Sequence, residues 1–466
     1  MNKTKKYRTR IILAGLAFCA ILVILFVGCN NINTANNSNT VKKTDTIAKA
    51  GNTGSVPDIG ITLPVLDALF FENGFKADLK SKLKLTEKQI ENLKNAASVS
   101  VADLSEDGTN YLGSTRAVKQ LSEDQIRGIL GQEKADQLYR LVAQRYSGVD
   151  LAGLFPKQPN SVPHDTRIVV NAPAFRMDIF QDGKLMKTYR VGIGYPEFPL
   201  PTGMRRADTI IFNPTWTPPS EPWVKGKFKA GKKVKAGSKV NPLGVIKIPI
   251  GMPSLIHGGK DVSKLGNFAS HGCVGLTNEQ VRNFTVILMQ LGGNPILKEG
   301  ILSLEKHKKK TQSVKLASPV LVELRYETIV AENGGLHIYR DVYERGTNTL
   351  ENATRVLKIY GINYESLAAQ EKEALTNALT VMNRDSKGNP IADNNNSKDT
   401  AIKKGRVADS KLDGAKKGKV TRSVTGHKDM VIPIAALQGK GYPGPVNLDT
   451  GLLRSTALTR KKNSTK

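Results

Sequence analysis

The residues most able to do chemistry are His257, in the stretch LIHGG, and Cys273, which follows sixteen positions later in the stretch SHGCVGL. The chain has three cysteines, and the other two, Cys19 and Cys29, lie in or just after an N-terminal apolar run. The folded body therefore has one thiol and no disulfide partner for it. An unpaired thiol outside the cytoplasm is an oxidation liability unless its reactivity is used, and a nearby histidine is the group that converts a thiol to a thiolate. The pair indicates nucleophilic catalysis by cysteine.

The N-terminus predicts export. Residues 1–10 carry five Lys or Arg residues, residues 11–27 are apolar and uncharged, and Gly28 and Cys29 follow. This is the layout of a bacterial signal sequence. The segment FVGC also resembles a lipoprotein cleavage box, in which Cys29 would be lipidated and become the first mature residue. The alternative is an uncleaved anchor helix, because the run approaches the roughly 20 residues that span a bilayer. Either way we expect a protein of the cell envelope or periplasm that is held at a membrane.

The net charge of +28 is high, and no nucleic-acid motif accompanies it. Because export removes the usual nucleic-acid partner, anionic envelope polymers and lipid headgroups are the expected partners of this charge. Much of the excess is local: residues 225–247 contain eight lysines and no acidic residue, and residues 383–426 are polar and rich in Lys, Asn, Asp and Gly. The second stretch has the composition of a disordered segment.

Composition and periodicity divide the chain into six parts. They are residues 1–29, the leader or anchor; 30–60, a disordered tether; 61–160, a helical module; 165–300, a catalytic domain; 311–382, a small α+β extension; and 383–466, a basic and largely disordered tail. In the helical module, LTEKQI and LSEDQI are near-copies that each combine a Thr or Ser cap with Gln three residues later. They predict helices that start near residues 87 and 123, with a further helix ending near Tyr146.

From Arg167 the apolar residues follow the alternation of strands. A hairpin is predicted around Asp182 and Gly183, because this dipeptide supplies positive φ. A helix is predicted over residues 278–291, capped by Thr277. Two more strands, 320–326 and 336–343, are expected around the Gly-rich turn that begins at Asn333, and another helix between residues 365 and 379.

The segment from about 167 to 299 resembles the catalytic domain of the L,D-transpeptidases, the YkuD-like family. The family pattern is a His-Gly pair followed by Ser/Thr-His-Gly-Cys, which here is His257-Gly258 and SHGC ending at Cys273. The flanking stretches RMDIF, PTG, NPTWTPP and NPLG fit as well. The resemblance implies a mainly β catalytic domain, a YkuD-like β-sandwich, and the strands at 320–343 also resemble an extension of some larger members. With the N-terminal α-helical module that periodicity predicts, the expected fold is this domain, the module and a small α+β C-terminal extension.

The resemblance also implies a function: peptidoglycan L,D-transpeptidation, with 3→3 cross-links formed through a thioester and with neither metal nor cofactor. Cys273 would be the nucleophile and His257 the proton donor and acceptor. The carbonyl of Gly258 would orient the imidazole, and the amide of Gly272 would bind the oxyanion. Two functions stay open beside it. One is a carboxypeptidase or endopeptidase-type hydrolase, since water can resolve the same thioester. The other is a non-catalytic wall anchor.

Residues around this pair have less certain roles. His271 either lines the site or holds its loop, and Ser270 is expected to order the loop. Trp216, Lys232 and Lys233 are candidates for substrate contact; the alternatives are a core or wall position for the tryptophan and a solvated loop for the lysines. Two departures from the family pattern matter: Gly259 stands where Thr is common, and Gly275 stands where many relatives have Arg or Asn. An absent Arg removes a charge that could hold a substrate carboxylate or brace the site.

Overall fold

A computed structural model describes residues 61–72, 74–102, 115–145, 159–219, 224, 228–251, 254–391 and 420–452. All of them belong to one compact unit, Gly54–Lys466. The expected leader, the lipidation site at Cys29 and the tether lie outside the described residues. Among the helices of the described residues, none is long and apolar enough to cross a bilayer.

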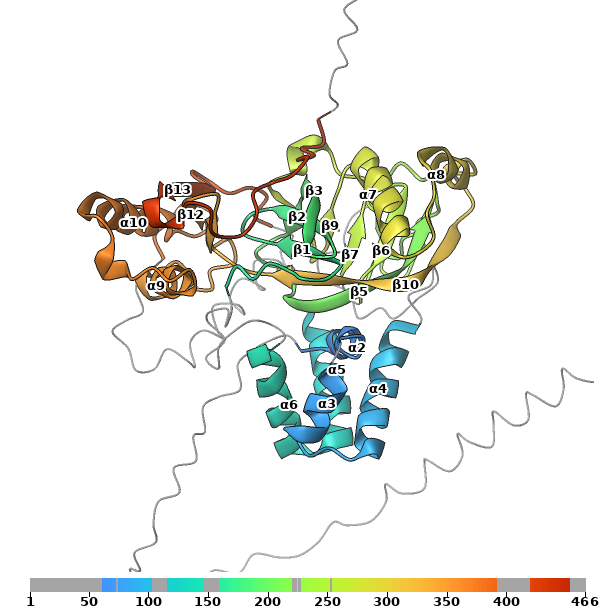
Figure 1. The fold of residues 1–466 in the computed structure, drawn as a ribbon. Coiled ribbons are helices and arrows are strands. Elements are labelled where there is room, and N and C mark those ends of the chain that lie inside the picture. The colour runs from blue at the N-terminus through green and yellow to red at the C-terminus, as the bar shows by residue number, and fades with distance from the viewer. Residues whose placement is uncertain are drawn as a thin grey trace, which may run out of the picture. The chain divides into compact units, whose positions relative to one another are not determined.

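The N-terminal region is a helical module, as predicted (Figure 1). Its helices are α2 (Leu63–Leu69), α3 (Phe75–Ser81), α4 (Glu87–Ala102), α5 (Thr115–Leu130) and α6 (Gln132–Arg145). Their apolar faces form a separate core that also contains Met204 of strand β5, so the module packs on the catalytic sheet. Asp67 of α2 forms an ion pair with Arg206 of the same strand, which fixes this contact.

One predicted helix start in the module is right and one is wrong. Helix α4 begins at Glu87, where Thr86 caps it. The start predicted near residue 123 is wrong, because α5 begins at Thr115 and Ser122 lies inside it. The Ser122 side chain is buried, and its hydroxyl accepts a hydrogen bond from the backbone N–H of Leu63 at 3.1 Å. The polar residue that resembles a cap instead ties helix α5 to the start of α2.

The catalytic region is built on an eight-stranded sheet in the order β3-β2-β1-β10-β5-β6-β7-β9. The bounds are β1 (Arg167–Asn171), β2 (Arg176–Gln181), β3 (Lys184–Arg190), β5 (Gly203–Phe212), β6 (Ile246–Pro249), β7 (Leu255–His257), β9 (Val274–Gly275) and β10 (Gln312–Arg325). Strands β4 (Ile193–Gly194) and β8 (Phe268–Ser270) form a separate short sheet. The β-rich expectation is confirmed, and so is the β2–β3 hairpin, whose turn residues Asp182 and Gly183 both have positive φ.

The main core lies between this sheet and helix α7 (Asn278–Leu291). Val281, Phe284 and Leu288 repeat at helical spacing and are all fully buried in it. Thr277 caps the helix as predicted, with its hydroxyl accepting from the N–H of Gln280 at 3.1 Å. Helix α8 (Lys298–Glu305) and the short 3-10 turn η1 (Val262–Lys264) complete this region.

Strand β10 corrects the expected domain boundary. Residues 320–326 were expected in a C-terminal extension, but β10 lies inside the catalytic sheet, parallel to β1 and antiparallel to β5. Its register shifts between Lys315 and Val320, where Pro319 interrupts the ladder, as a proline within a sheet requires. The alternation of apolar residues marks this stretch as a strand, but nothing local says which sheet it joins.

The C-terminal extension is a three-stranded sheet covered by helices. It comprises β11 (Ile329–Glu332), β12 (Gly335–Tyr339), β13 (Asp429–Pro433), α9 (Leu350–Ile359) and α10 (Ala369–Met382), with the 3-10 turns η2 (Tyr364–Ser366) and η4 (Ala435–Leu437). Residues 383–466 were expected to be largely disordered, which is wrong for 420–452. Strand β13 pairs with β12, and Ile432 and Ile434 enter the core. The polar composition of residues 383–426 led to the prediction of disorder for the whole tail, so the short strand β13 that follows was missed.

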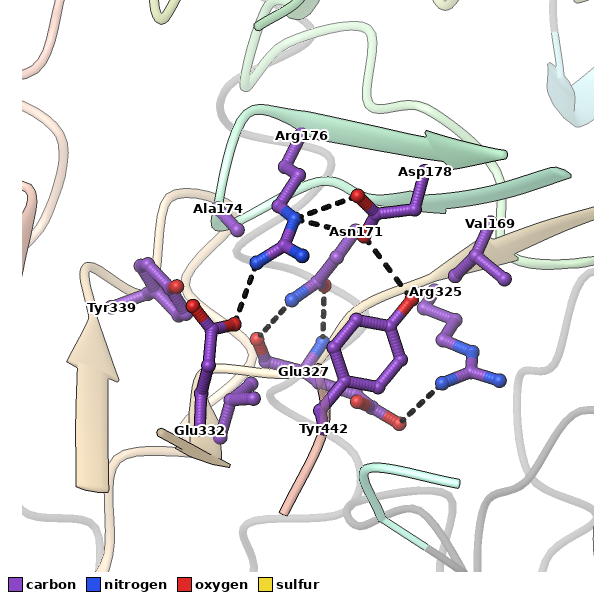
Figure 2. A pocket seen from close by; sticks show the side chains of 11 residues that line it. Val169, Asn171, Ala174, Arg176, Asp178, Arg325, Glu327, Glu332, Tyr339 and Tyr442 are labelled. Carbon is purple, nitrogen blue, oxygen red and sulfur yellow. Dashed lines mark hydrogen bonds and ion pairs between the residues drawn. The ribbon is translucent and has the colours of Figure 1, made fainter. Parts of the chain in front are cut away.

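Charged residues gather where the extension meets the catalytic sheet (Figure 2). We call Arg176, Asp178, Arg325, Glu327 and Glu332 the ion-pair cluster; they line a small pocket together with Tyr442. The Arg176 guanidinium contacts Asp178 at 2.8 Å and Glu332 at 2.6 Å, while the Tyr442 hydroxyl donates to Asp178 at 3.1 Å. Because these residues come from β2, β10, β11 and the C-terminal segment, the cluster joins the two sheets.

Candidate active site on strands β7 and β9

The two predicted catalytic residues lie on adjacent parallel strands. Strand β7 pairs with β9 so that Ile256 lies opposite Val274 and His257 opposite Gly275. Ile256 and Val274 are both fully buried in the core. Since side chains alternate along a strand, His257 and Gly275 point to the other face, and Cys273, two residues before Gly275, joins them there. The sheet therefore brings the histidine and the thiol to one face.

The imidazole of His257 is buried, with 2 % of the residue exposed, and has a fixed tautomer. Its Nδ1 lies 2.7 Å from the carbonyl oxygen of Gly258. Because a carbonyl can only accept, Nδ1 carries the hydrogen and Nε2 has the free lone pair. Burial and the charge of Lys260 lower the His257 pKa to about 3, against the opposing effect of the Gly258 and Leu243 carbonyls. The ring is thus neutral at physiological pH and can accept a proton at Nε2.

Cys273 is half-buried and follows a turn that Ser270 organises. The Ser270 hydroxyl donates to the carbonyl of Cys273 at 2.6 Å and accepts from its N–H at 2.9 Å. Ser270 thus has the contacts of a loop-ordering residue. Burial raises the pKa of the Cys273 thiol above its ordinary value, while a backbone hydrogen bond from Leu255 and the charge of Lys260 oppose the rise. Within the described residues, the thiol and the His257 ring are not hydrogen-bonded to each other, a separation that is common before substrate binds.

Gly272, the residue before Cys273, has a backbone conformation that favours glycine. Its φ of +97° is one that residues with a side chain rarely adopt. Its carbonyl accepts a hydrogen bond from the Ser254 hydroxyl at 2.9 Å. The N–H of Cys273 already donates to Ser270, whereas the N–H of Gly272 has no hydrogen-bond partner among the described residues. Of the two amides near the thiol, that of Gly272 is therefore the better candidate for an oxyanion.

His271 packs among aromatic rings at the edge of the site. Its ring meets Tyr195 edge-on at a centroid distance of 5.0 Å and Phe198 at 4.7 Å. Burial and the charges of Lys260 and Arg422 lower its pKa to about 4. Arg422 belongs to the C-terminal segment that was expected to be disordered, and its guanidinium hydrogen-bonds Tyr195. His271 therefore both lines the site and contacts the residues that hold its loop.

The proposed substrate-contact residues lie in the loop between β5 and β6. Trp216 packs edge-on against Phe228 at a centroid distance of 4.9 Å and pairs through its backbone with Val234. Lys232 and Lys233 are both exposed. The end of this loop reaches the site, where the carbonyl of Leu243 faces the His257 ring.

Two residues near the pair were not singled out from the sequence. The side-chain oxygen of Asn278 accepts from the N–H of Gly259 at 2.9 Å and from that of Val245 at 3.2 Å, which clamps the turn after His257. The other is Lys260, whose charge acts on both His257 and Cys273. The only local signal for Asn278 is its place as the first residue of α7, where a polar side chain can face a neighbouring loop.

The comparison with protein families confirms the resemblance for this part of the chain. Residues 165–289 match the model of the L,D-transpeptidase catalytic domain, YkuD. The match contains both His257 and Cys273 and ends before β10. A search of curated proteins gave no match.

Solved structures similar to the chain are also L,D-transpeptidases. The catalytic domain of the E. faecium enzyme has 19 % identity and a TM-score of 0.21, and the match covers 35 % of this chain and 99 % of that one. The Mycobacterium smegmatis enzyme has 16 % identity and a TM-score of 0.21, with 34 % and 58 % covered. L,D-transpeptidase 1 of Mycobacterium tuberculosis has 13 % identity and a TM-score of 0.20, with 34 % and 62 % covered. The match thus spans about three fifths of the two mycobacterial chains.

Proposed function

We propose that the domain at 165–289 is a cysteine-dependent L,D-transpeptidase that acts on peptidoglycan stem peptides. The observation that carries the proposal is the β7–β9 register, which places Cys273 and a neutral, carbonyl-oriented His257 on one face of the sheet. The family model that spans both residues supports it. A buried structural cysteine would need neither a histidine of fixed tautomer nor an unpaired amide beside it.

The acylation step follows from these groups. The Cys273 sulfur attacks the carbonyl carbon between the third and fourth residues of a stem peptide, and its proton passes to Nε2 of His257. The amide of Gly272 donates to the oxyanion of the tetrahedral intermediate. As the C–N bond breaks, His257 returns the proton to the leaving amine, and a thioester on Cys273 remains.

The acceptor decides the product. An amine of a second stem attacks the thioester to form a 3→3 cross-link, or an amine of another acceptor is attached to the stem. If water attacks instead, the same residues give an L,D-carboxypeptidase or endopeptidase-type hydrolase. The third candidate is a wall anchor without catalysis, which the neutral histidine and the nearby thiol argue against.

Incubation of the purified full chain with tetrapeptide muropeptides, followed by mass spectrometry, separates these functions. We expect cross-linked dimers and release of the terminal D-amino acid. Trimmed stems without dimers would favour the hydrolase. Unchanged muropeptides with native protein, together with no adduct at Cys273 after exposure to a carbapenem, would overturn catalysis altogether.

We also propose that the chain is exported and attached to a membrane through the N-terminal segment. Its basic start and apolar run support this, and the resemblance of FVGC to a lipoprotein cleavage box supports lipidation at Cys29. A lipidated protein has a mature chain that begins at Cys29 with added acyl mass and partitions into detergent, and Cys29→Ser abolishes both. Recovery of an uncleaved N-terminus would favour the anchor helix.

A further inference from the structure

The side chain of Lys260 packs beside Gly275, the residue that pairs with His257 in the β7–β9 register. A Cβ atom placed on Gly275 would lie 2.8 Å from both Cγ and Cε of Lys260 and 3.3 Å from its Cδ. The two separations of 2.8 Å are shorter than real Cβ contacts and that of 3.3 Å is tighter than most, so the lysine stem would have to shift to admit a side chain at 275. The backbone N–H of Lys260 donates to the carbonyl of Leu276 at 3.0 Å, which holds the lysine beside strand β9.

Within the part of the chain that the structure describes, the ammonium group of Lys260 has no carboxylate partner. No ion pair joins it to an acidic side chain within the described residues, although the residue is only half-exposed. The charged and titratable groups that influence it or its neighbours are Cys273, His257, His271, Lys264 and Arg422. Among these groups Cys273 is the only one that can become an anion. Of the two charged groups that act on Lys260, Lys264 repels the ammonium and an ionised Cys273 attracts it.

The positive charge cannot come from the histidine. Burial holds the pKa of His257 at about 3, so an imidazolium beside a thiolate is not the resting state at neutral pH. Burial lowers the pKa of Lys260 from its ordinary value, whereas the charge of a Cys273 thiolate raises it.

We propose that Lys260 supplies the positive charge of the active site and stabilises the Cys273 thiolate, and that Gly275 is the residue that leaves room for it. The inference rests on the proposed function in that Cys273 is taken as the nucleophile. Lys260 is a positioning residue in this scheme, because it acts through the sulfur. In this scheme the side chain of Lys260, from the turn after His257, occupies the space beside Gly275 that a side chain at 275 would take.

The test measures the thiol itself and needs no peptidoglycan. The full chain is alkylated with iodoacetamide from pH 6 to 10, and the rate is followed on the peptide that contains Cys273. Because a nearby opposite charge shifts the pKa of an acid by about one unit or more, we expect Lys260→Met to move the midpoint upward and to slow alkylation at pH 7 roughly tenfold. Lys260→Arg, which keeps the charge, should stay near the native midpoint.

Two further variants keep the test decisive. Gly275→Ala displaces the lysine without removing its charge, and its backbone needs no positive φ, so an intermediate midpoint is expected even if Lys260→Met fails to fold. Lys264→Met makes the same change of charge one turn away and should leave the midpoint unchanged. An unshifted midpoint in Gly275→Ala and in folded Lys260→Met, or an equal shift in Lys264→Met, would overturn the proposal. The alkylation midpoint of the variants can also shift while the native protein leaves muropeptides unchanged. That result would support the role of Lys260 and contradict only the proposed function.

Discussion

Two places in this molecule bury charged or ionisable groups, and they do so in opposite ways. In the ion-pair cluster each buried charge meets an opposite one: burial alone would lower the pKa of Arg176, but Asp178 and Glu332 raise it above its ordinary value. On the face of β7 and β9, Lys260 has no carboxylate partner among the described residues, and its charge acts on the Cys273 thiol and the neutral His257 imidazole. Paired charges join two sheets, whereas an unpaired cation beside a thiol leaves that thiol able to react.

The largest effect is expected on the reactive face. Cys273→Ala removes the nucleophile, so all turnover of muropeptides and all adduct formation with a carbapenem should disappear. The fold should remain, because a half-buried thiol contributes little packing. Intact-mass analysis and thermal unfolding measure the two outcomes. An adduct on any other residue would contradict the assignment.

The next largest effect is expected from His257→Ala, which removes the general base and should lower the rate of acylation by roughly two to four orders of magnitude. Because the folded pKa of His257 is about 3, its Nε2 stays unprotonated as the pH falls from 8 to 5. The acylation rate of the native protein should therefore not fall with a midpoint near pH 6.5. The pH profile of His257→Ala should have the same shape at a lower rate. The measurement is the pH profile of acylation in both proteins, and a histidine limb near 6.5 in the native one would show that the ring is not held neutral.

The free energy of unfolding should differ most between variants of the ion-pair cluster and variants of the β7–β9 face. Arg176→Met leaves two buried carboxylates without their partner, so we expect a loss of about 3–5 kcal/mol in the free energy of unfolding. Lys260→Met removes a cation that has no such partner, so we expect a much smaller change, and Arg176→Met should leave the thiol midpoint unchanged. Denaturant unfolding and the alkylation profile measure both. Equal losses of stability in the two variants would mean that Lys260 is a structural charge as well.

The sequence allowed the centre of the site to be predicted, but not its surroundings. His257, Cys273 and the Gly258 carbonyl lie in local motifs, and Thr277 caps α7 through bonds within one turn. Lys260 and Asn278 act through contacts between β7, β9 and α7, which exist only after the sheet has formed its register.

The errors have the same origin. Ser122 has the spacing of a helix cap, but tertiary packing places it inside α5 against Leu63. The apolar alternation of β10 marks a strand correctly, and β13 was missed; for both, pairing partners 90 or more residues away decide which sheet the strand joins. Local rules thus predict elements, while membership in a sheet is a long-range property.

The smallest effect is expected from the lysine-rich loop. Lys232 and Lys233 are exposed, so we expect any influence on substrate to act through long-range attraction of its carboxylates. Their replacement by Gln should raise the apparent KM for muropeptides by less than about tenfold at low ionic strength, and the difference should vanish in salt because screening acts over about 8 Å at physiological strength. Acylation by a small β-lactam should be unaffected.

The matched control for this prediction is the replacement of Lys88 and Lys94, two exposed lysines of helix α4, by Gln. It makes the same change in net charge at a distance from the catalytic sheet. If both double variants respond to salt as the native protein does, the loop has no steering role. If both shift KM equally, net charge alone is responsible. A shift of KM in the Lys232/Lys233 variant alone would show that the loop raises the local concentration of substrate. The exposed lysines would then have a weak effect on substrate binding, beside the stronger effect of Lys260 on Cys273.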